Sequence, residues 1–365
     1  MLRRILLSLF LSVFAAVPAA AGDWPAFRLD PAHRAWDGAG DIAATPDLLW
    51  QFDTGDVVES SPAVVDGVVY AGSFSQALFA IDGATGKKKW AFPVGGLLRA
   101  SPAVVDGAVY FGADDNKFYA VDAATGAAKW SFDLGPGGEQ SSPAVVDDVV
   151  YFGAFDKYVY ALNAGTGTLR WKFRVGGGVL ASPAVVDGVV YISSIGGILY
   201  ALDAKSGTRI WQMRARGPVF SSPAVAEGVV VVGSDDGNIY ARDALTGDER
   251  WTFTTGREVF SSPAIVDGIV YIGAHTGFVY ALDAASGAER WKTQLNGPVF
   301  SSPAVTDAHI YIGSSDGHLY ALRRGDGTIA WRFAAGDRVW TSPAVVGGRI
   351  YFGSHTGFVY ALASQ

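Results

Sequence analysis

Histidine and carboxylate side chains are the groups in this sequence that could bind a metal or act as an acid or base. His275 and His355 stand in identical His-Thr-Gly segments far apart in the chain, and His318 follows Asp316 by two residues. A metal site needs three or four ligands that converge on one ion. Neither arrangement predicts such convergence, so we interpret these histidines as surface turn residues and expect no metal site.

Carboxylates in Asp-Gly pairs are a second candidate chemistry, because aspartate oxygens are good calcium ligands. The pairs begin at Asp66, Asp106, Asp187 and Asp267. A calcium-binding loop of the EF-hand kind needs the longer pattern Asp-x-Asp-x-Asp-Gly, which the sequence lacks. Asp-Gly is also the preferred sequence of a two-residue hairpin turn with positive φ at both positions. The pairs therefore predict turns.

Tryptophan is a third candidate, because an indole ring can stack on a flat cofactor. Tryptophans recur about every forty residues, at 50, 90, 130, 171, 211, 251, 291 and 331. The tripeptide Ser-Pro-Ala recurs with the same period, starting at 61, 101, 142, 182, 222, 262, 302 and 342. A cofactor would need one or two special copies, whereas one copy in every repeat indicates a structural role. We expect each indole to be buried between repeats.

Each repeat reads as four short strands separated by turns. In the first repeat, β-branched and aromatic runs alternate with turn residues, and the runs cover 61–65, 68–72, 77–81 and 89–92. Such a sheet cannot bury both of its faces alone. Repeats of about forty residues with four strands each are typical of a β-propeller. The small Ser and Ala residues suit strands crowded near an axis, and Pro fits the start of such a strand.

The phase of the repeat predicts how the ring closes. Trp50 precedes the first Ser-Pro-Ala, and only three strands follow the last one, which begins at Ser342. The segment 48–52 should therefore supply the outer strand of the C-terminal blade, which leaves no open sheet edge at the junction. We predict an all-β fold: an eight-bladed β-propeller with four-stranded antiparallel blades, closed by the N-terminal strand.

The repeated residues resemble a known family of repeats. The segment 80–86, Ala-Ile-Asp-Gly-Ala-Thr-Gly, followed by Trp90, is similar to the tryptophan-docking motif of quinoprotein (PQQ-like) propellers. Most other blades carry the motif, but Asn163 and Arg323 replace its Asp in two of them. The resemblance covers about residues 48–365. It implies the fold, with the indole N–H bonded to a backbone carbonyl, and it includes both enzymes and the BamB-type scaffold of outer-membrane assembly.

Function is expected where the repeats differ. The first and third turns of the blades are nearly uniform, whereas the opposite face varies. The residue two positions before each Ser-Pro is polar in three consecutive blades and apolar in the next five, in the order Glu59, Arg99, Gln140, Leu180, Phe220, Phe260, Phe300 and Trp340. On a closed ring this pattern predicts a polar arc and an apolar arc, a surface like a protein or peptide hot spot. The alternative is that the aromatics fill the core between inner strands.

Two classes of function follow from the resemblance. A PQQ-dependent dehydrogenase would hold the quinone with calcium on the ring axis and use a catalytic Asp. Enzymes of the alcohol-oxidising branch also place adjacent cysteines against the cofactor, and this chain has no cysteine. Because the repeats also carry almost no insertions, we expect a non-catalytic, BamB-like scaffold without a cofactor that binds a protein or peptide. PQQ catalysis remains the alternative, and carbohydrate binding a minor one.

The N-terminal segment and the net charge predict where the protein is located and which partners it excludes. Arg3 and Arg4, an apolar run from Ile5 to Val17 and small residues to Ala21 are typical of a cleaved signal peptide. We expect a signal peptide at 1–21, an extension at 22–47 that lies across the ring, and the propeller at 48–365. The protein would be periplasmic or secreted, a monomer, and without a lipid anchor. The formal net charge of −7 does not favour nucleic acid as a partner.

Overall fold

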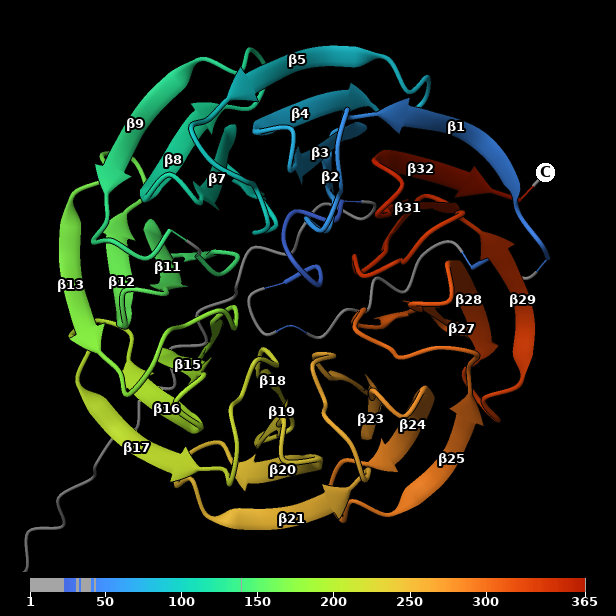
Figure 1. Cartoon of the computed structure of the whole chain (residues 1–365). Coiled ribbons are helices and arrows are strands. Elements are labelled where there is room, and N and C mark those ends of the chain that lie inside the picture. Colours follow the sequence, from blue (N-terminus) through green and yellow to red (C-terminus); the bar gives the residue numbers. More distant parts are fainter. Residues whose placement is uncertain (1–22, 31–32, 34–40, 43, 139, 365) are drawn as a thin grey trace, which may run out of the picture.

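The computed structural model describes residues 23–30, 33, 41–42, 44–138 and 140–364, which form a closed ring of eight sheets (Figure 1). Every sheet has four antiparallel strands, from one nearest the centre to one at the rim. The predicted eight-bladed β-propeller is therefore confirmed. Within the described residues, no helix has the length and hydropathy needed to cross a membrane. The predicted signal peptide lies outside them.

Seven blades are continuous in the chain, and the eighth joins its two ends. The first four blades contain β2 (Ala63–Val65), β3 (Val68–Ser73), β4 (Ala77–Asp82), β5 (Lys88–Pro93), β6 (Ala103–Val105), β7 (Ala108–Ala113), β8 (Lys117–Asp122), β9 (Ala128–Asp133), β10 (Ala144–Val146), β11 (Val149–Ala154), β12 (Tyr158–Asn163), β13 (Leu169–Arg174), β14 (Ala184–Val186), β15 (Val189–Ser194), β16 (Ile198–Asp203) and β17 (Arg209–Arg214). The next three contain β18 (Ala224–Ala226), β19 (Val229–Gly233), β20 (Asn238–Asp243), β21 (Glu249–Thr254), β22 (Ala264–Val266), β23 (Ile269–Gly273), β24 (Phe278–Asp283), β25 (Glu289–Gln294), β26 (Ala304–Val305), β27 (His309–Gly313), β28 (His318–Arg323) and β29 (Ile329–Ala334). The eighth contains β30 (Ala344–Val346), β31 (Arg349–Gly353), β32 (Phe358–Ala363) and β1 (Asp47–Asp53).

The turns divide the ring into two faces. Asp66 and Gly67 have φ values of 50° and 69°, as the Asp-Gly pair predicts. The third turn of that blade bonds to this first turn, because the Gly83 N–H donates to the Gly67 carbonyl at 2.8 Å. We call this side the turn face. The second turn bonds instead to the blade connection, where the Asp114 N–H donates to the Leu97 carbonyl at 2.9 Å. We call the opposite side the connection face.

Serine hydroxyls link the innermost strands around the axis. The backbone N–H of Ser61 donates to Oγ of Ser101 at 2.9 Å, and that of Ser101 donates to Oγ of Ser142 at 2.9 Å. The same bond joins the later blades and closes the ring, where the Ser342 N–H donates to Oγ of Ser61 at 2.8 Å. The repeated Ser of Ser-Pro-Ala thus satisfies a backbone donor that no neighbouring strand reaches.

Each repeated tryptophan lies against the next blade. The Trp171 Nε1–H donates to the Ala204 carbonyl at 2.9 Å, and the indole packs on Gly207. A Cβ on Gly207 would lie 2.6 Å from the indole Cδ2, and its φ is +70°, so the position requires glycine. The same contact recurs from Trp50 to Trp291.

The last tryptophan docks on the N-terminal segment. In the closing blade no third turn joins β32 to β1, because β1 precedes all the other strands in the chain. The Trp331 Nε1–H donates instead to the Ile42 carbonyl at 2.9 Å. Asp41 is held by the same blade, where His309, Thr306 and Tyr311 donate to its Oδ1 at 2.7, 3.0 and 3.0 Å. Residues 41–42 therefore complete the ring next to β1.

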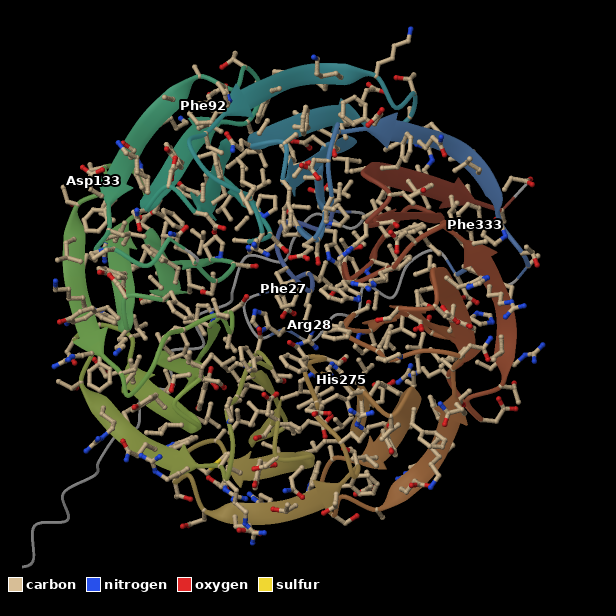
Figure 2. All side chains as sticks on the ribbon, in the orientation of Figure 1. Phe27, Arg28, Phe92, Asp133, His275 and Phe333 are labelled. Carbon is tan, nitrogen blue, oxygen red and sulfur yellow. The ribbon has the colours of Figure 1, made fainter. Side chains whose placement is uncertain are left out.

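The described part of the segment before β1 lies across the ring. Trp24 forms an antiparallel bridge with Val64 of β2, and the Pro25 carbonyl accepts from the Val104 N–H at 2.7 Å. On the opposite side of the ring, His33 Nδ1 donates to the Pro223 carbonyl at 2.9 Å. Figure 2 shows Phe27 and Arg28 near the centre. The segment thus reaches inner strands of three blades.

Candidate binding surface on the connection face

The residues two positions before each Ser-Pro lie on the connection face, between the rim strand of one blade and the innermost strand of the next. Seven of the eight are partly exposed, namely Glu59, Arg99, Leu180, Phe220, Phe260, Phe300 and Trp340. Gln140 alone is buried. The aromatic members are thus neither core residues nor fully exposed side chains.

Four of these aromatics touch one another in blade order. The ring centroids are 4.7 Å apart for Phe220 and Phe260, 5.4 Å for Phe260 and Phe300, and 4.3 Å for Phe300 and Trp340. We call these four residues the aromatic arc. Contacts of this length are typical of stacked and tilted aromatic pairs. The structure thus joins four of the five residues of the predicted apolar arc into one surface across four blades.

Two histidines extend the aromatic arc. The His275 ring lies 4.7 Å from Phe260 and 4.1 Å from Phe300, between ring centroids (Figure 2 shows its position). His355 lies 4.5 Å from Trp340. Burial lowers the pKa of both histidines, although neighbouring carboxylates oppose it, so the neutral imidazole is favoured. Both histidines lie in second turns and also form part of this surface.

Charged residues continue the surface beyond Trp340. His355 Nε2 lies 3.4 Å from Oε1 of Glu59, and Arg99 bridges Glu59 at 3.3 Å and Asp114 at 3.2 Å. The Arg99 guanidinium also lies 4.6 Å above the Phe74 ring. Burial raises the pKa of Asp114 despite the opposing charge of Arg99. The predicted polar arc is therefore a linked ionic cluster at the end of the aromatic arc.

Gln140 does not join this surface, whereas Leu180 is partly exposed in the connection before that of Phe220. Gln140 is 5% exposed, and its side-chain amide donates back to the Gly138 carbonyl. Its blade connection contains the one extra residue in the forty-residue spacing, and Gly137 and Gly138 both have positive φ there. This longer connection turns the Gln140 side chain inward against Gly112, where a Cβ would collide with Oε1 of Gln140.

Phe155 and Asp235 are further features of this face, and the repeat pattern places Asp235 in one of its second turns. Phe155 is 39% exposed and packs over Gly178, two residues before Leu180. The Asp235 N–H donates to the Pro218 carbonyl at 2.9 Å, so its side chain is near the Phe220 end of the arc. Burial and then the charge of Glu258 raise the pKa of Asp235 to about 6. Both residues lie in second turns, and their neighbours were visible only once the fold was known.

A bound quinone with calcium would require particular ligands, and the described residues can be compared with that requirement. PQQ with calcium on the axis would need converging oxygen ligands, and the part of the chain described contains no group of three or more His, Cys, Asp or Glu residues that could hold a metal. The Arg28 guanidinium lies near the centre of the ring, where it would repel calcium. The residues present do not fit that group.

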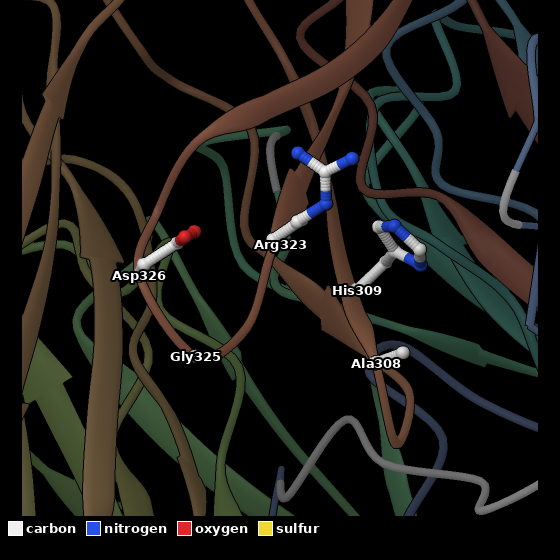
Figure 3. A pocket seen from close by; sticks show the side chains of 5 residues that line it. All are labelled: Ala308, His309, Arg323, Gly325 and Asp326. Atoms are coloured by element: carbon white, nitrogen blue, oxygen red, sulfur yellow. The ribbon is translucent and has the colours of Figure 1, made fainter.

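The turn face carries a different hollow. A pocket of about 280 Å³ lies between the first and third turns of the blade β26–β29, lined by Ala308, His309, Arg323, Gly325 and Asp326 (Figure 3). Arg323 donates to Oγ1 of Thr328 at 3.2 Å, and His309 is bonded to Asp41. Because its charged groups serve the turn and the ring closure, this pocket is a weaker candidate than the aromatic arc.

Fold and repeat define this protein as an eight-bladed propeller of the PQQ-like, BamB-like class. Within that class, the chain belongs to the family described as "Beta-alanine-activating enzyme, beta-propeller", whose model matches residues 68–309, about two thirds of the chain. No curated protein matches the sequence significantly.

Solved structures with similar folds include both a scaffold and enzymes. BamB from Moraxella catarrhalis is 20% identical, with a TM-score of 0.76 over 87% of this chain and 100% of that one. A europium-containing methanol dehydrogenase is 14% identical, with a TM-score of 0.82 over 95% and 99%. A quinohemoprotein alcohol dehydrogenase from Comamonas testosteroni is 17% identical, with a TM-score of 0.81 over 95% and 81%. At these identities the likeness concerns the fold alone.

Proposed function

We propose that this protein is an exported, non-catalytic scaffold, BamB-like, that binds a protein or peptide partner on its connection face. The observation that carries the proposal is the aromatic arc, in which four partly exposed rings touch across four blades. Large aromatic side chains in a contiguous patch are the residues that contribute most to protein interfaces.

The surroundings of the arc support a binding role. Each ring is held by its neighbours, so little side-chain entropy remains to be lost on association. The Trp340 Nε1–H donates to Oγ of Ser315 at 2.9 Å, which fixes that ring on a second turn. Leu180 and Phe155 extend the apolar surface at one end, and Glu59 and Arg99 provide a polar rim at the other.

The cellular setting of the proposal rests on the sequence. The signal-peptide pattern at 1–21 favours export to the periplasm or beyond, and a protein partner in the cell envelope would be available there. Similarity in fold to BamB is consistent with a scaffold, whereas similarity to the methanol dehydrogenase keeps a quinone-dependent enzyme as the competing function.

Site-specific photo-crosslinking tests the binding surface. A photo-reactive phenylalanine analogue would replace Phe260 in the arc, and a matched control would replace Leu245, which is 79% exposed in a third turn on the turn face. We expect a discrete protein adduct in the native envelope from position 260 and none from position 245. Adducts from position 245 alone would contradict the proposed surface.

A thermal titration separates the scaffold from the enzyme. The purified protein would be heated with and without micromolar PQQ and calcium. A ligand that binds only the folded state raises Tm by mass action. We expect no rise, and a rise of several degrees that needs both PQQ and calcium would overturn the proposal in favour of a quinoprotein enzyme.

A further inference from the structure

Arg28 is a buried charge at the centre of the ring. Arg28 is 1% exposed as a whole residue. Figure 2 shows it beside Phe27, where the N-terminal segment crosses the ring. The backbone there is tightly turned, with φ of 58° at Arg28 and 74° at Leu29. The Asp30 N–H donates to the Arg28 carbonyl at 3.0 Å, which fixes the turn. The backbone that carries the Arg28 side chain is therefore fixed by local structure.

The guanidinium has no bonding partner in the described protein. Nε, Nη1 and Nη2 of Arg28 are all buried without a hydrogen bond. A guanidinium carries five N–H donors and no acceptor, so burial without acceptors leaves every donor unsatisfied. Burial lowers the pKa of Arg28 to about 9, and the charge of Asp30 opposes this. The side chain is thus cationic at neutral pH, and burying an unpaired cation is strongly unfavourable.

His33, a second titratable residue of the segment, adds no negative charge. Its ring lies 5.5 Å from that of Phe27, and its Nδ1–H is used by the Pro223 carbonyl. Burial first, and then the positive charge of Arg28, lower the pKa of His33 to about 3. Its imidazole is therefore neutral, and among the described residues Asp30 is the carboxylate that acts on the Arg28 charge, without a hydrogen bond to the guanidinium.

We propose that Arg28 binds a small carboxylate, such as formate or acetate, at the centre of the ring. The two oxygens of a carboxylate match the parallel donors of a guanidinium and form a bidentate, charge-assisted pair. The near-complete burial of Arg28 favours a small ligand over a side chain of a large partner. This site is separate from the aromatic arc and does not depend on the proposed scaffold function.

Thermal unfolding tests the site directly. The wild-type protein, Arg28→Met and the exposed control Arg209→Met would be heated in a buffer free of carboxylates and phosphate. Formate would then be added against sodium chloride at constant ionic strength. Ligand linkage predicts that the wild type and Arg209→Met gain the same increment in Tm for every tenfold rise in formate above Kd. Arg28→Met should show no formate dependence, and without formate it should melt no lower than the wild type.

A direct measurement keeps the proposal testable if Arg28→Met does not fold. Equilibrium dialysis of the wild type with labelled formate should show saturable binding of one formate per chain. Absence of saturable binding would overturn the proposal. Equal stabilisation by chloride or phosphate would overturn the carboxylate assignment, and equal formate dependence in Arg28→Met would remove Arg28 from the site.

Discussion

Removing the carboxylate of Asp41 should loosen the closure of the ring. Its Oδ1 accepts hydrogen bonds from His309, Thr306 and Tyr311 at 2.7, 3.0 and 3.0 Å, and its side chain is only 28% exposed. Hydrogen bonds to a charged acceptor contribute about 1.5–3 kcal/mol and neutral ones about 0.5–1.5 kcal/mol. Asp41→Asn should therefore cost about 1–2 kcal/mol of unfolding free energy.

The alanine variant of Asp41 should cost more than the asparagine variant. Tyr311 is 0% and His309 5% exposed, so Asp41→Ala leaves two buried polar groups without their acceptor. The penalty for each such group is about 1–3 kcal/mol, which should lower Tm by several degrees. Asp47→Asn, at an exposed position in β1, is the control. Equal Tm for wild type and Asp41→Ala would refute the role of residues 41–42 in closure.

The pH dependence of the Asp41 variants supplies a second check. Burial raises the pKa of Asp41, but the bonds from His309, Thr306 and Tyr311 outweigh it, so the pKa is lowered overall. An acid with a lowered pKa stabilises the fold above its unfolded value of about 4, and this stability is lost as the pH falls through the folded pKa. The difference in Tm between wild type and Asp41→Asn should therefore shrink below about pH 4.

Two further predictions concern the docking glycines and the acidic end of the arc. In thermal unfolding, Gly207→Ala should destabilise the protein by at least about 2 kcal/mol more than Gly188→Ala. Both glycines have positive φ, but a Cβ on Gly207 would meet Trp171, whereas nothing lies within 4 Å of a Cβ on Gly188. Equal losses of stability in the two variants would contradict the docking role of Gly207. Because the pKa of Asp235 is raised to about 6, its carboxyl should make stability fall as the pH rises from about 4 to 6. Asp235→Asn should remove that contribution, and an unchanged pH profile would contradict the burial of this carboxyl.

Most of the fold follows from local sequence signals. Asp66 and Gly67 adopt the positive φ values that their pair predicts, and the repeated Trp and Gly meet at seven of the eight blade junctions. The position of Trp50 before the first Ser-Pro-Ala correctly predicts that β1 completes the last blade. These features are predictable because the sequence signals recur at a fixed spacing, so that their order along the chain indicates which blades adjoin.

The closure through residues 41–42 carries no such signal. The other repeated tryptophans donate to a carbonyl in the third turn of the next blade, whereas Trp331 faces the closing blade, in which no third turn joins β32 to β1. Ile42 lies outside every repeat, so periodicity cannot select it. Its contact with Trp331 becomes visible only when both ends of the chain are placed in space.

The candidate site was predictable in part. The order of Phe220, Phe260, Phe300 and Trp340 along the repeats indicated a continuous arc, and their rings touch in that order. The insertion of His275 between two of them was not predictable, because it depends on how a second turn packs on the neighbouring connection. Similarly, one extra residue in a connection was enough to bury Gln140.

The most direct test of the proposed binding surface is the affinity of the crosslinked partner for variants of the aromatic arc. The double variant Phe260→Ala and Trp340→Ala would be compared with the control Leu245→Ala and Ile329→Ala, whose side chains are 79% and 44% exposed away from the arc. Loss of two hot-spot aromatics should raise Kd by about thirtyfold or more, equivalent to about 2 kcal/mol, with the control unchanged. An unchanged Kd in a folded Phe260→Ala and Trp340→Ala protein would contradict the central claim.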